Sequence, residues 1–425
     1  MRLVCAPADH PDLAGKVRDI SIVLYDQPQK QGQGSAGAAV FNQIRRRGLQ
    51  PAPKAWDFLS LALSVVAADG GISRTKCVDA WTRSIDLRIA VNDPGFWTAQ
   101  TALLQTMLRF LTTDVWTLEF TEGGVLPAPP KVLARPEEKC VALLSGGLDS
   151  LVGALDLTAA GKKPLVVSQV AKGNKKDQKY FAAKIGGGLT HLLLNHNAKF
   201  PGAKELSQRS RSIIFYAYGI LAATALAEYQ KGGTVTLYAC ENGLISINPP
   251  LTPARLGSLS TRTTHPVFIA MLQQLLDAAG LRVRIDNPYQ FKTKGEMLAE
   301  CADHDFLRKF AHTSTSCGRF GTFGLKHCGR CVPCMIRRAA FHAWGIKDDT
   351  KYVYCDLGKN DDEHARFDDV RSAAMGVAMM QADGIDSVLG ASLTSPLIPD
   401  PQPYRQTVER GLAEVGTFLA AQGVK

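Results

Sequence analysis

The middle of the chain contains the stretch Cys140-Val141-Ala142-Leu143-Leu144-Ser145-Gly146-Gly147-Leu148-Asp149-Ser150. Its first five residues are apolar, which is typical of a buried parallel strand. Apolar residues at helical spacing follow from Leu151 to Leu157, so the segment Ser145–Ser150 is predicted to be a strand-to-helix turn. Its two glycines permit positive φ and close approach of a ligand. Backbone N–H groups at the helix start, with the two serine hydroxyls, predict an anion site.

We expect Asp149 to cap the N-terminus of this helix and to be able to contact a magnesium ion. The turn lacks the Gly-Lys-Ser/Thr ending of a Walker A loop. It resembles instead the SGGxDS loop of the N-type ATP pyrophosphatases, which cleave ATP between the α and β phosphates and leave AMP on an acceptor oxygen. This resemblance implies that ATP is bound by Ser145, Gly146, Gly147, Leu148, Asp149 and Ser150. The alternative is an ordinary glycine-rich turn.

Length and composition bound the class of protein. A chain of 425 residues predicts two or three domains, and 45% hydrophobic residues predict a substantial core. The net charge of +10 fits a polyanionic ligand such as ATP or an acidic partner. Nucleic acid is not expected, because aromatic residues do not interleave with the scattered Lys and Arg residues. A membrane span is not expected either, because no apolar run is long enough.

The N-terminus lacks the pattern of a signal peptide, and the chain has ten cysteines. This combination predicts a cytoplasmic protein, in which clustered thiols bind metal rather than form disulfides.

Residues 1–130 are expected to form an α/β accessory domain. Its predicted strands are Asp19–Tyr25, Ile85–Val91 and Trp116–Phe120, and its predicted helices are Trp56–Ala68 and Phe96–Leu111. The Gln/Gly-rich segment Gln29–Ala36 is expected to be a loop. No catalytic motif is found here, so packing or partner binding is favoured. Four prolines between Val125 and Pro136 indicate a linker.

Residues 137–345 alternate strand and helix, which predicts a doubly wound parallel sheet with right-handed crossovers. The predicted strands are Cys140–Leu144, Pro164–Gln169, Leu189–Asn195, Thr234–Cys240 and Leu281–Ile285, and the clearest helix runs from about Arg211 to Glu228. Ligands bind at the carboxyl ends of such strands. Ser168 and Gln169 are therefore expected to contact the nucleotide at this edge, beside the loop.

The segment from Asn242 to Pro266 has few helix signals and is long for a loop. Its polar residues Asn242, Arg255, Arg262 and His265 are candidate substrate contacts. The alternative is a solvated surface loop.

Cys317 and the motif Cys328-Gly329-Arg330-Cys331-Val332-Pro333-Cys334 predict a tetrahedral zinc site with four thiolates. A site closed by four sulfurs is structural rather than catalytic. His312 or His327 could replace one cysteine as a ligand, although a lone histidine is more often a surface or packing residue. The remaining six cysteines are expected to be inert buried thiols: Cys5, Cys77, Cys140, Cys240, Cys301 and Cys355.

Residues 346–425 carry no motif and are expected to form a helical extension. A helix is predicted over Asp368–Met380. The last helix places Val408, Leu412, Val415 and Leu419 on one face, which predicts docking on the core of this chain.

With these motifs together, residues 139–345 resemble the 7-cyano-7-deazaguanine synthase (QueC) family. Arg211, the Lys292-Thr293-Lys294-Gly295-Glu296 segment and Arg337 after the cysteines match positions of that family. The resemblance implies an adenine nucleotide alpha hydrolase-like, Rossmann-like fold that uses ATP, Mg²⁺ and Zn²⁺. It also implies contacts of Arg211 and Lys294 with phosphate or carboxylate, and catalytic roles for Ser145, Asp149, Ser150 and Lys294.

The chain departs from the family in the aspartate-rich substrate segment, which is replaced by Ile247–Pro250 and Ser260–Pro266. Both ends also carry extra regions. This layout is similar to QueC-like proteins of the bacterial anti-phage Qat and type IV CBASS systems, which implies a different acceptor, such as the N-terminal amine of a partner protein.

The implied reaction is adenylation of a carboxylate, 7-carboxy-7-deazaguanine, followed by attack of an amine. With ammonia the product is the free nitrile, and with a partner protein it is a conjugate. Two further alternatives are tRNA thiolation, for which Cys240 is the only plausible catalytic cysteine, and a non-catalytic binding subunit. Oligomerisation is possible.

Overall fold

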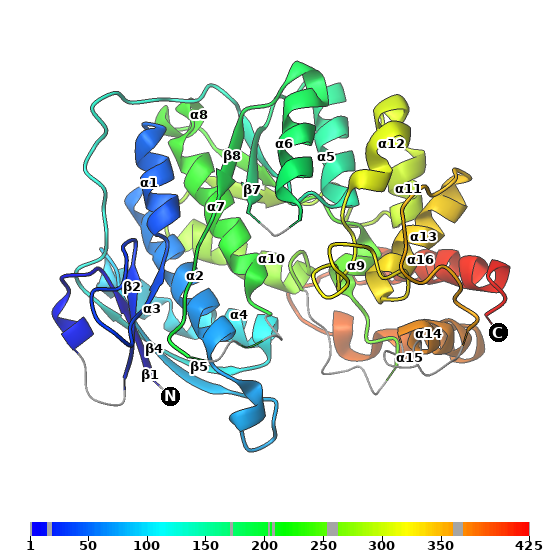
Figure 1. The fold of residues 1–425 in the computed structure, drawn as a ribbon, viewed down its shortest axis with the longest axis horizontal. Coiled ribbons are helices and arrows are strands. Elements are labelled where there is room, and N and C mark those ends of the chain that lie inside the picture. Colours follow the sequence, from blue (N-terminus) through cyan, green and yellow to red (C-terminus); the bar gives the residue numbers. More distant parts are fainter. Residues whose placement is uncertain are drawn as a thin grey trace. The chain divides into compact units, whose positions relative to one another are not determined.

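The computed structural model describes residues 2–14, 19–170, 173–202, 205, 209–252, 262–359 and 369–424 (Figure 1). The chain divides into two compact units. The first contains Met1–Val141, Leu192–Leu237 and Phe268–Ile285, and the second contains Ala142–His191, Tyr238–Val267 and Asp286–Lys425. The predicted domain boundaries at 1–130, 137–345 and 346–425 remain predictions.

The first unit contains a five-stranded parallel sheet in the order β3-β2-β1-β4-β5. Its strands are β1 (Arg2–Ala6), β2 (Ile20–Leu24), β3 (Gly34–Ala36), β4 (Ser84–Ala90) and β5 (Val115–Thr121). Side chains alternate between the two faces of each strand, so Ile85, Leu87 and Ile89 share one face of β4. These residues are buried, and so are their register partners on β5. The predicted α/β architecture of this region is confirmed.

Helices cover the apolar face of this sheet. One of them, α2 (Pro53–Gly71), is buried on nearly all sides. It packs against β4 and α7 (Arg211–Ala225) (Figure 1). The other helices of this unit are η1 (Pro11–Ala14), α1 (Ala38–Arg46), η2 (Arg74–Lys76), α3 (Pro94–Ala99), α4 (Thr101–Thr112) and α8 (Ala227–Gln230). On the opposite face the described residues include the ion-paired side chains of Arg2, Arg88 and Glu119.

Two predictions in this region are wrong. The helix expected over Phe96–Leu111 is two helices, because Gln100 ends α3 and precedes α4. The segment Gln29–Ala36 is not wholly a loop, since Gly34–Ala36 pairs with β2 as strand β3. Strand β1, helix α1 and the short helices η1 and η2 were not anticipated.

Buried charges tie the end of α2 to the start of α7 within the first unit. Asp69 accepts hydrogen bonds through Oδ2 from the backbone N–H groups of Arg209 and Ser210, at 2.7 and 2.8 Å. Its Oδ1 lies 2.5 Å from Nη2 of Arg83, which also pairs with Asp114 at 2.6 Å. Arg74 also pairs with Asp114. All four charged side chains of this network are essentially buried, so the network is part of the core.

The second sheet has the order β10-β9-β6-β7-β8. Its strands are β6 (Cys140–Leu143), β7 (Leu165–Gln169), β8 (His191–Leu194), β9 (Val235–Tyr238) and β10 (Val283–Asp286). From β6 the chain moves outward through β7 to β8, and it later returns to β9 on the other side of β6. The expected doubly wound parallel sheet is confirmed, and the order reverses between β6 and β9.

The carboxyl ends of β6, β9 and β10 fall in the second unit, together with most helices of this half. These helices are α5 (Leu148–Ala159), α6 (Lys175–Lys184), η3 (Ile185–Gly187), α9 (Gly243–Ile247), α11 (Lys294–Ala299), α12 (His304–Phe310), η5 (Ala311–Thr313), α13 (Val332–Trp344), α14 (Asp369–Asp383), α15 (Asp386–Leu389), η6 (Gly390–Leu393) and α16 (Gln402–Ala421). Helix α10 (Pro266–Ala278) spans the boundary between the units.

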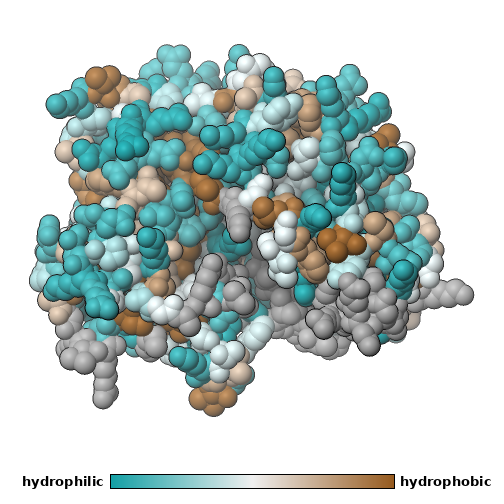
Figure 2. All heavy atoms as spheres, viewed as in Figure 1, coloured by the Kyte–Doolittle hydropathy of each residue, from teal (hydrophilic) through white to brown (hydrophobic). Residues whose placement is uncertain are grey.

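The C-terminal region is helical, as expected, and α16 packs against α9, α13 and α14 in the second unit (Figure 1). The face carrying Val408, Leu412, Val415 and Leu419 is buried, which confirms that the last helix docks on this chain. On the molecular face in Figure 2, hydrophilic residues make up most of the described surface and apolar residues form small separate groups. No helix of the described residues is both long and apolar enough to cross a membrane.

Candidate functional site

The Ser145–Ser150 segment, called here the anion loop, connects β6 to α5. Gly146 has a φ of 86°, in the left-handed region. A Cβ atom at Gly146 would lie 3.2 Å from Cγ of Gln178, so both backbone conformation and space favour glycine here. The strand–turn–helix predicted from the sequence is therefore the structure of this segment.

Hydrogen bonds within the anion loop fix its two serines. Ser145 Oγ accepts from the N–H of Gly147 at 3.1 Å and lies 3.0 Å from Ser150 Oγ. Ser150 Oγ donates to the carbonyl of Gly147 at 3.0 Å. The first N–H groups of an α-helix have no acceptor within the helix, so the start of α5 can bind an anion.

Asp149 does not cap α5, which corrects the sequence prediction. The N-cap is Gly147, and Asp149 lies in the first turn. Asp149 Oδ1 instead lies 2.5 Å from Lys294 Nζ, and its Oδ2 accepts from Asn242 Nδ2 at 2.7 Å. Both oxygens of Asp149 thus accept hydrogen bonds, and its expected contact with a magnesium ion stays a prediction.

Lys294 and Asn242 each begin a helix. Thr293 and Glu296 form a capping box at the start of α11, which holds Lys294 beside the anion loop. Asn242 caps α9 by accepting from the N–H of Ile245 at 3.1 Å. The structure thus brings together three residues predicted on separate grounds: Asp149 from the anion loop, Lys294 from the family resemblance and Asn242 from the long segment that ends at Pro266.

The C-terminal helix α16 contacts the same turn of α11. Glu414 Oε2 accepts from the N–H of Gly295 at 3.2 Å, and Oε1 of the same carboxylate accepts from the hydroxyl of Thr293. Arg410 Nε lies 2.7 Å from Glu296 Oε1. The extension therefore helps to position the residue that precedes Lys294 and the one that follows it.

Ser168 and Gln169 lie at the end of β7. Ser168 is fully buried, donates to the carbonyl of Leu144 at 2.6 Å and lies 2.8 Å from His191 Nε2. Its hydroxyl is thus engaged inside the second unit. Nucleotide contacts by Ser168 and Gln169 stay predictions.

Gln178 of α6 was not anticipated from the sequence. Its Nε2 donates to the carbonyls of Ser145 and Gln169, at 2.9 and 3.0 Å. It therefore joins the anion loop to the end of β7. A glutamine within a Lys-rich helix gives no local signal of this role, because the contact is made between distant segments.

The remaining candidates are Arg211, Arg255, Arg262 and His265. Arg211 is exposed at the start of α7, in the first unit, and its predicted phosphate contact stays a prediction. Arg255 lies outside the described residues. His265 is buried, and burial together with Arg262 lowers the pKa of its imidazole to about 3. Substrate contacts by Arg262 and His265 also stay predictions.

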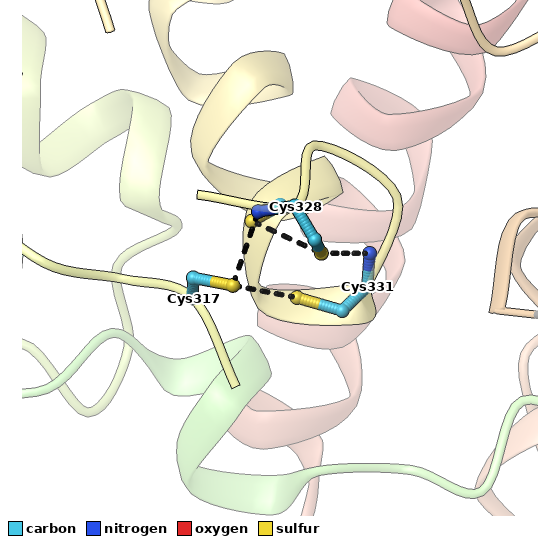
Figure 3. A group of neighbouring side chains, drawn as sticks. Cys317, Cys328 and Cys331 are labelled. Carbon is cyan, nitrogen blue, oxygen red and sulfur yellow. Dashed lines mark hydrogen bonds between the residues drawn. The ribbon is translucent and has the colours of Figure 1, made fainter. Parts of the chain in front are cut away.

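Cys317, Cys328, Cys331 and Cys334 lie together in the second unit, and Figure 3 labels the first three of them. Their sulfur atoms are all within 4.8 Å of one another, and two pairs, Cys317–Cys331 and Cys328–Cys334, are 3.9 Å apart. A tetrahedral zinc ion with Zn–S bonds of about 2.3 Å separates its sulfurs by about 3.8 Å. The four-cysteine site therefore fits zinc.

Backbone donors and Arg337 support this site. The N–H of Cys328 points to Cys317 Sγ and that of Cys331 to Cys328 Sγ, each at 3.3 Å, a pattern that stabilises thiolates (Figure 3). Arg337 is buried and donates to the hydroxyls of Ser314 and Ser316, which precede Cys317. These contacts fix the backbone just before Cys317, the first of the four cysteines.

Neither histidine is needed as a ligand. His327 Nε2 accepts from the N–H of Ser316 at 3.2 Å, and burial lowers the pKa of His327 to about 4. His312 is exposed and is not among the clustered ligand atoms. The prediction that the other six cysteines are buried is wrong for Cys355, which is exposed, while Cys77 and Cys240 are half-buried.

Glu241 follows β9 and forms a second polar group near Asp149. Its side chain accepts a short hydrogen bond from Thr264, whose hydroxyl lies 2.7 Å from that of Ser246. Burial raises the pKa of the Glu241 carboxyl to about 7; Asp149 also raises it, whereas Thr264 and Lys294 lower it. This raised pKa depends on the tertiary surroundings of Glu241, which its local sequence does not reveal.

A doubly wound parallel sheet with an anion loop after β6 and a four-cysteine site defines the class: the fold is adenine nucleotide alpha hydrolase-like. Comparison with known proteins narrows this class. Residues 263–345 match the family model described as "Queuosine biosynthesis protein QueC".

The chain is also similar to several 7-cyano-7-deazaguanine synthases. That of Paracoccus denitrificans (strain Pd 1222) is 29% identical over 247 residues, covering 52% of this chain and 95% of the relative. That of Rhizobium etli (strain CIAT 652) is 28% identical over 243 residues, covering 52% and 94%. That of Agrobacterium fabrum (strain C58 / ATCC 33970) is 28% identical over 233 residues, covering 50% and 92%. Nearly the whole length of each relative thus corresponds to about half of this chain.

Proposed function

We propose that this protein adenylates a carboxylate with ATP and passes the activated acyl group to an amine, with 7-carboxy-7-deazaguanine as the acid. The observation that carries the proposal is the arrangement at the anion loop. There Lys294 lies 2.5 Å from Asp149, which also accepts from Asn242, at the start of a helix whose first N–H groups have no acceptor within the helix. The substrate class follows the named activity of the relatives.

The chemistry requires activation because a carboxylate is a poor electrophile. Its oxygen attacks the α phosphorus of ATP, the bond to the β-phosphate oxygen breaks, and pyrophosphate leaves. N–H groups at the start of α5 and the ammonium group of Lys294 would stabilise the negative charge that develops there. A bound zinc ion at the four-cysteine site would support the local fold and take no part in this step.

We further propose that the acceptor amine belongs to a partner protein. The relatives' length is accounted for by about half of this chain, so roughly the other half is additional to a synthase. A small amine such as ammonia needs no docking surface, whereas a chain end must be held about 3 Å from the activated carbonyl. Conjugation in anti-phage defence is the context implied by the sequence resemblance.

Release of 7-cyano-7-deazaguanine, with ammonia as acceptor, is the second candidate, since the similar enzymes carry that name. tRNA thiolation is disfavoured, because burial, together with Asp149 and two further carboxylates, raises the pKa of the Cys240 thiol. A thiol with a raised pKa is a weak nucleophile at neutral pH. A non-catalytic subunit would not release pyrophosphate.

The test is incubation of the purified protein with MgATP and 7-carboxy-7-deazaguanine, with AMP and pyrophosphate measured. Formation of both, dependent on the acid, is expected. Intact-mass analysis of co-encoded proteins then separates the acceptors: added mass on a partner supports conjugation, and free nitrile made from ammonia with no added mass supports the synthase reaction. No acid-dependent pyrophosphate would contradict the proposed function.

A further inference from the structure

Glu241 lies where the strand order of the second sheet reverses. The anion loop leaves the carboxyl end of β6, and Glu241 follows the carboxyl end of β9, the strand next to β6. Ligands of doubly wound sheets bind in the crevice at such a reversal. Its neighbour Asn242 bonds to Asp149, so the peptide of Glu241 is fixed directly to the loop residue.

The backbone of Glu241 is held on both sides by one side chain. Asn287 Nδ2 donates to the carbonyl of Glu241 at 2.8 Å, and Asn287 Oδ1 accepts from its N–H at 3.2 Å. This pair of bonds fixes the direction in which the carboxylate leaves the backbone.

A directed chain of donors ends on one oxygen of this carboxylate. Asn287 Nδ2 donates to Ser246 Oγ at 3.3 Å, Ser246 Oγ lies 2.7 Å from Thr264 Oγ1, and Thr264 donates to Glu241 Oε2. An ionised carboxylate only accepts, so the hydroxyl protons all point toward Glu241. Within the described part of the chain, no hydrogen bond is made to the second oxygen, Oε1.

A carboxylate with a purely structural role is bonded differently in the same molecule. Asp69 and Asp57 are buried, and each accepts hydrogen bonds through both oxygens. Glu241 is positioned as firmly as they are, but it keeps one oxygen available. This difference indicates a group that is held for use by a ligand.

The charges that act on Glu241 come from two helices. Asp149 of α5 raises the pKa of its carboxyl and Lys294 of α11 lowers it; burial is the largest cause, and the resulting value is about 7. Arg262 and His265 lie within two residues of Thr264, and burial lowers the pKa of both, so His265 is neutral near pH 7. A base poised near the working pH is the most effective general base.

We propose that Glu241 is the proton acceptor for the amine that attacks the acyl-adenylate. The inference rests on the proposed function and names a catalytic residue for its second step. The nitrogen forms a bond to the carbonyl carbon, its surplus proton passes to Glu241 Oε1, and the carbon–oxygen bond to AMP breaks. The products are the amide, AMP and a protonated Glu241, which then returns its proton to solvent.

The test compares Glu241→Gln with the matched surface variant Glu409→Gln, with ammonia or hydroxylamine as the amine. Hydroxylamine is largely unprotonated at neutral pH and attacks without strong help from a base. We expect Glu241→Gln to lower ammonia-dependent product formation by about 10²-fold or more, and hydroxamate formation by much less. Equal losses with both amines, or no loss with ammonia, would overturn the role. If the unaltered protein makes no acid-dependent pyrophosphate, the proposed function itself fails.

A second variant guards against a folding defect in the first. Thr264→Val removes a hydrogen bond that lowers the pKa of Glu241, so that pKa must rise. Because the ionised form is the active base, the acidic limb of the ammonia-dependent pH profile should move to higher pH relative to the unaltered protein. Ammonia titrates identically in both reactions, so an unmoved limb would contradict the assignment.

Discussion

Lys294 Nζ lies 2.5 Å from Asp149 Oδ1, although 145 positions separate the two residues in the sequence. Both side chains are largely buried, with 7% and 11% of their surface exposed. The pair joins the first turn of α5 to that of α11, so the anion loop and the Lys294 segment form one site. Breaking such a pair leaves an uncompensated buried charge, which typically costs about 3–5 kcal/mol.

This pair changes which loop variant is informative. Ser145 is exposed and its hydroxyl bonds only within the loop, so Ser145→Ala should leave the free energy of unfolding nearly unchanged. It should lower pyrophosphate release by about 10²-fold, as when one group that stabilises transition-state charge is removed. Asp149→Ala should also lower the free energy of unfolding, measured by urea unfolding, because it leaves the buried ammonium group of Lys294 without its carboxylate partner. Full pyrophosphate release by Ser145→Ala would place ATP elsewhere.

The four-cysteine site predicts one zinc per chain. Cys331→Ser should lose the metal and lower the melting temperature, because metal binding contributes folding free energy. Cys355→Ser is the matched control, since that thiol is exposed and outside the cluster. Elemental analysis measures the zinc content, and thermal unfolding measures the stability. A Cys331→Ser protein that keeps both its zinc and its melting temperature would contradict zinc binding by these four cysteines.

The buried network of the first unit predicts a large stability effect far from any catalytic group. Asp69→Asn replaces an acceptor of several N–H and O–H donors with a group that can offer only one acceptor oxygen. A loss of about 3–5 kcal/mol in the free energy of unfolding is expected. Asp26→Asn, at an exposed aspartate, should change stability by less than about 0.5 kcal/mol. Similar unfolding midpoints for the two variants would contradict this account.

His265 predicts part of the acid sensitivity of the fold. Burial lowers the pKa of its imidazole to about 3, whereas an unfolded histidine titrates near 6.5. The folded value is the lower one, so the stabilisation is fully present above pH 6.5 and is lost as the pH falls toward 3. His265→Gln should therefore lose less stability between about pH 7 and about pH 5 in urea titrations. The exposed His312→Gln should follow the unaltered protein, and identical slopes for all three would refute the prediction.

Local patterns explain which parts of the fold were predictable. The strand, anion loop and helix around Gly146 are contiguous, and the cysteine spacing specifies its own ligand set. The buried faces of β4 and α16 also follow from period-2 and period-3.6 patterns. Each of these signals lies within about twenty residues.

Features that depend on distant pairing were missed. Strand β3 has only three residues and is stable because it pairs with Ile22–Leu24. Asp149 was expected to cap its own helix, but Lys294 provides a stronger partner from another helix. Gln178 and the Thr264–Glu241 contact also join separate segments, and nothing in their local sequence indicates it.

The central claim is that the acid's own oxygen becomes bonded to the α phosphorus of ATP. The most direct measurement uses 7-carboxy-7-deazaguanine labelled with ¹⁸O in its carboxylate, together with MgATP and an amine, and mass spectrometry of the AMP formed. Adenylation predicts that AMP carries one ¹⁸O atom, because the amine displaces the labelled oxygen with the phosphate. Unlabelled AMP, with both ¹⁸O atoms retained in the acid, would show that water rather than the carboxylate attacks ATP and would contradict the account.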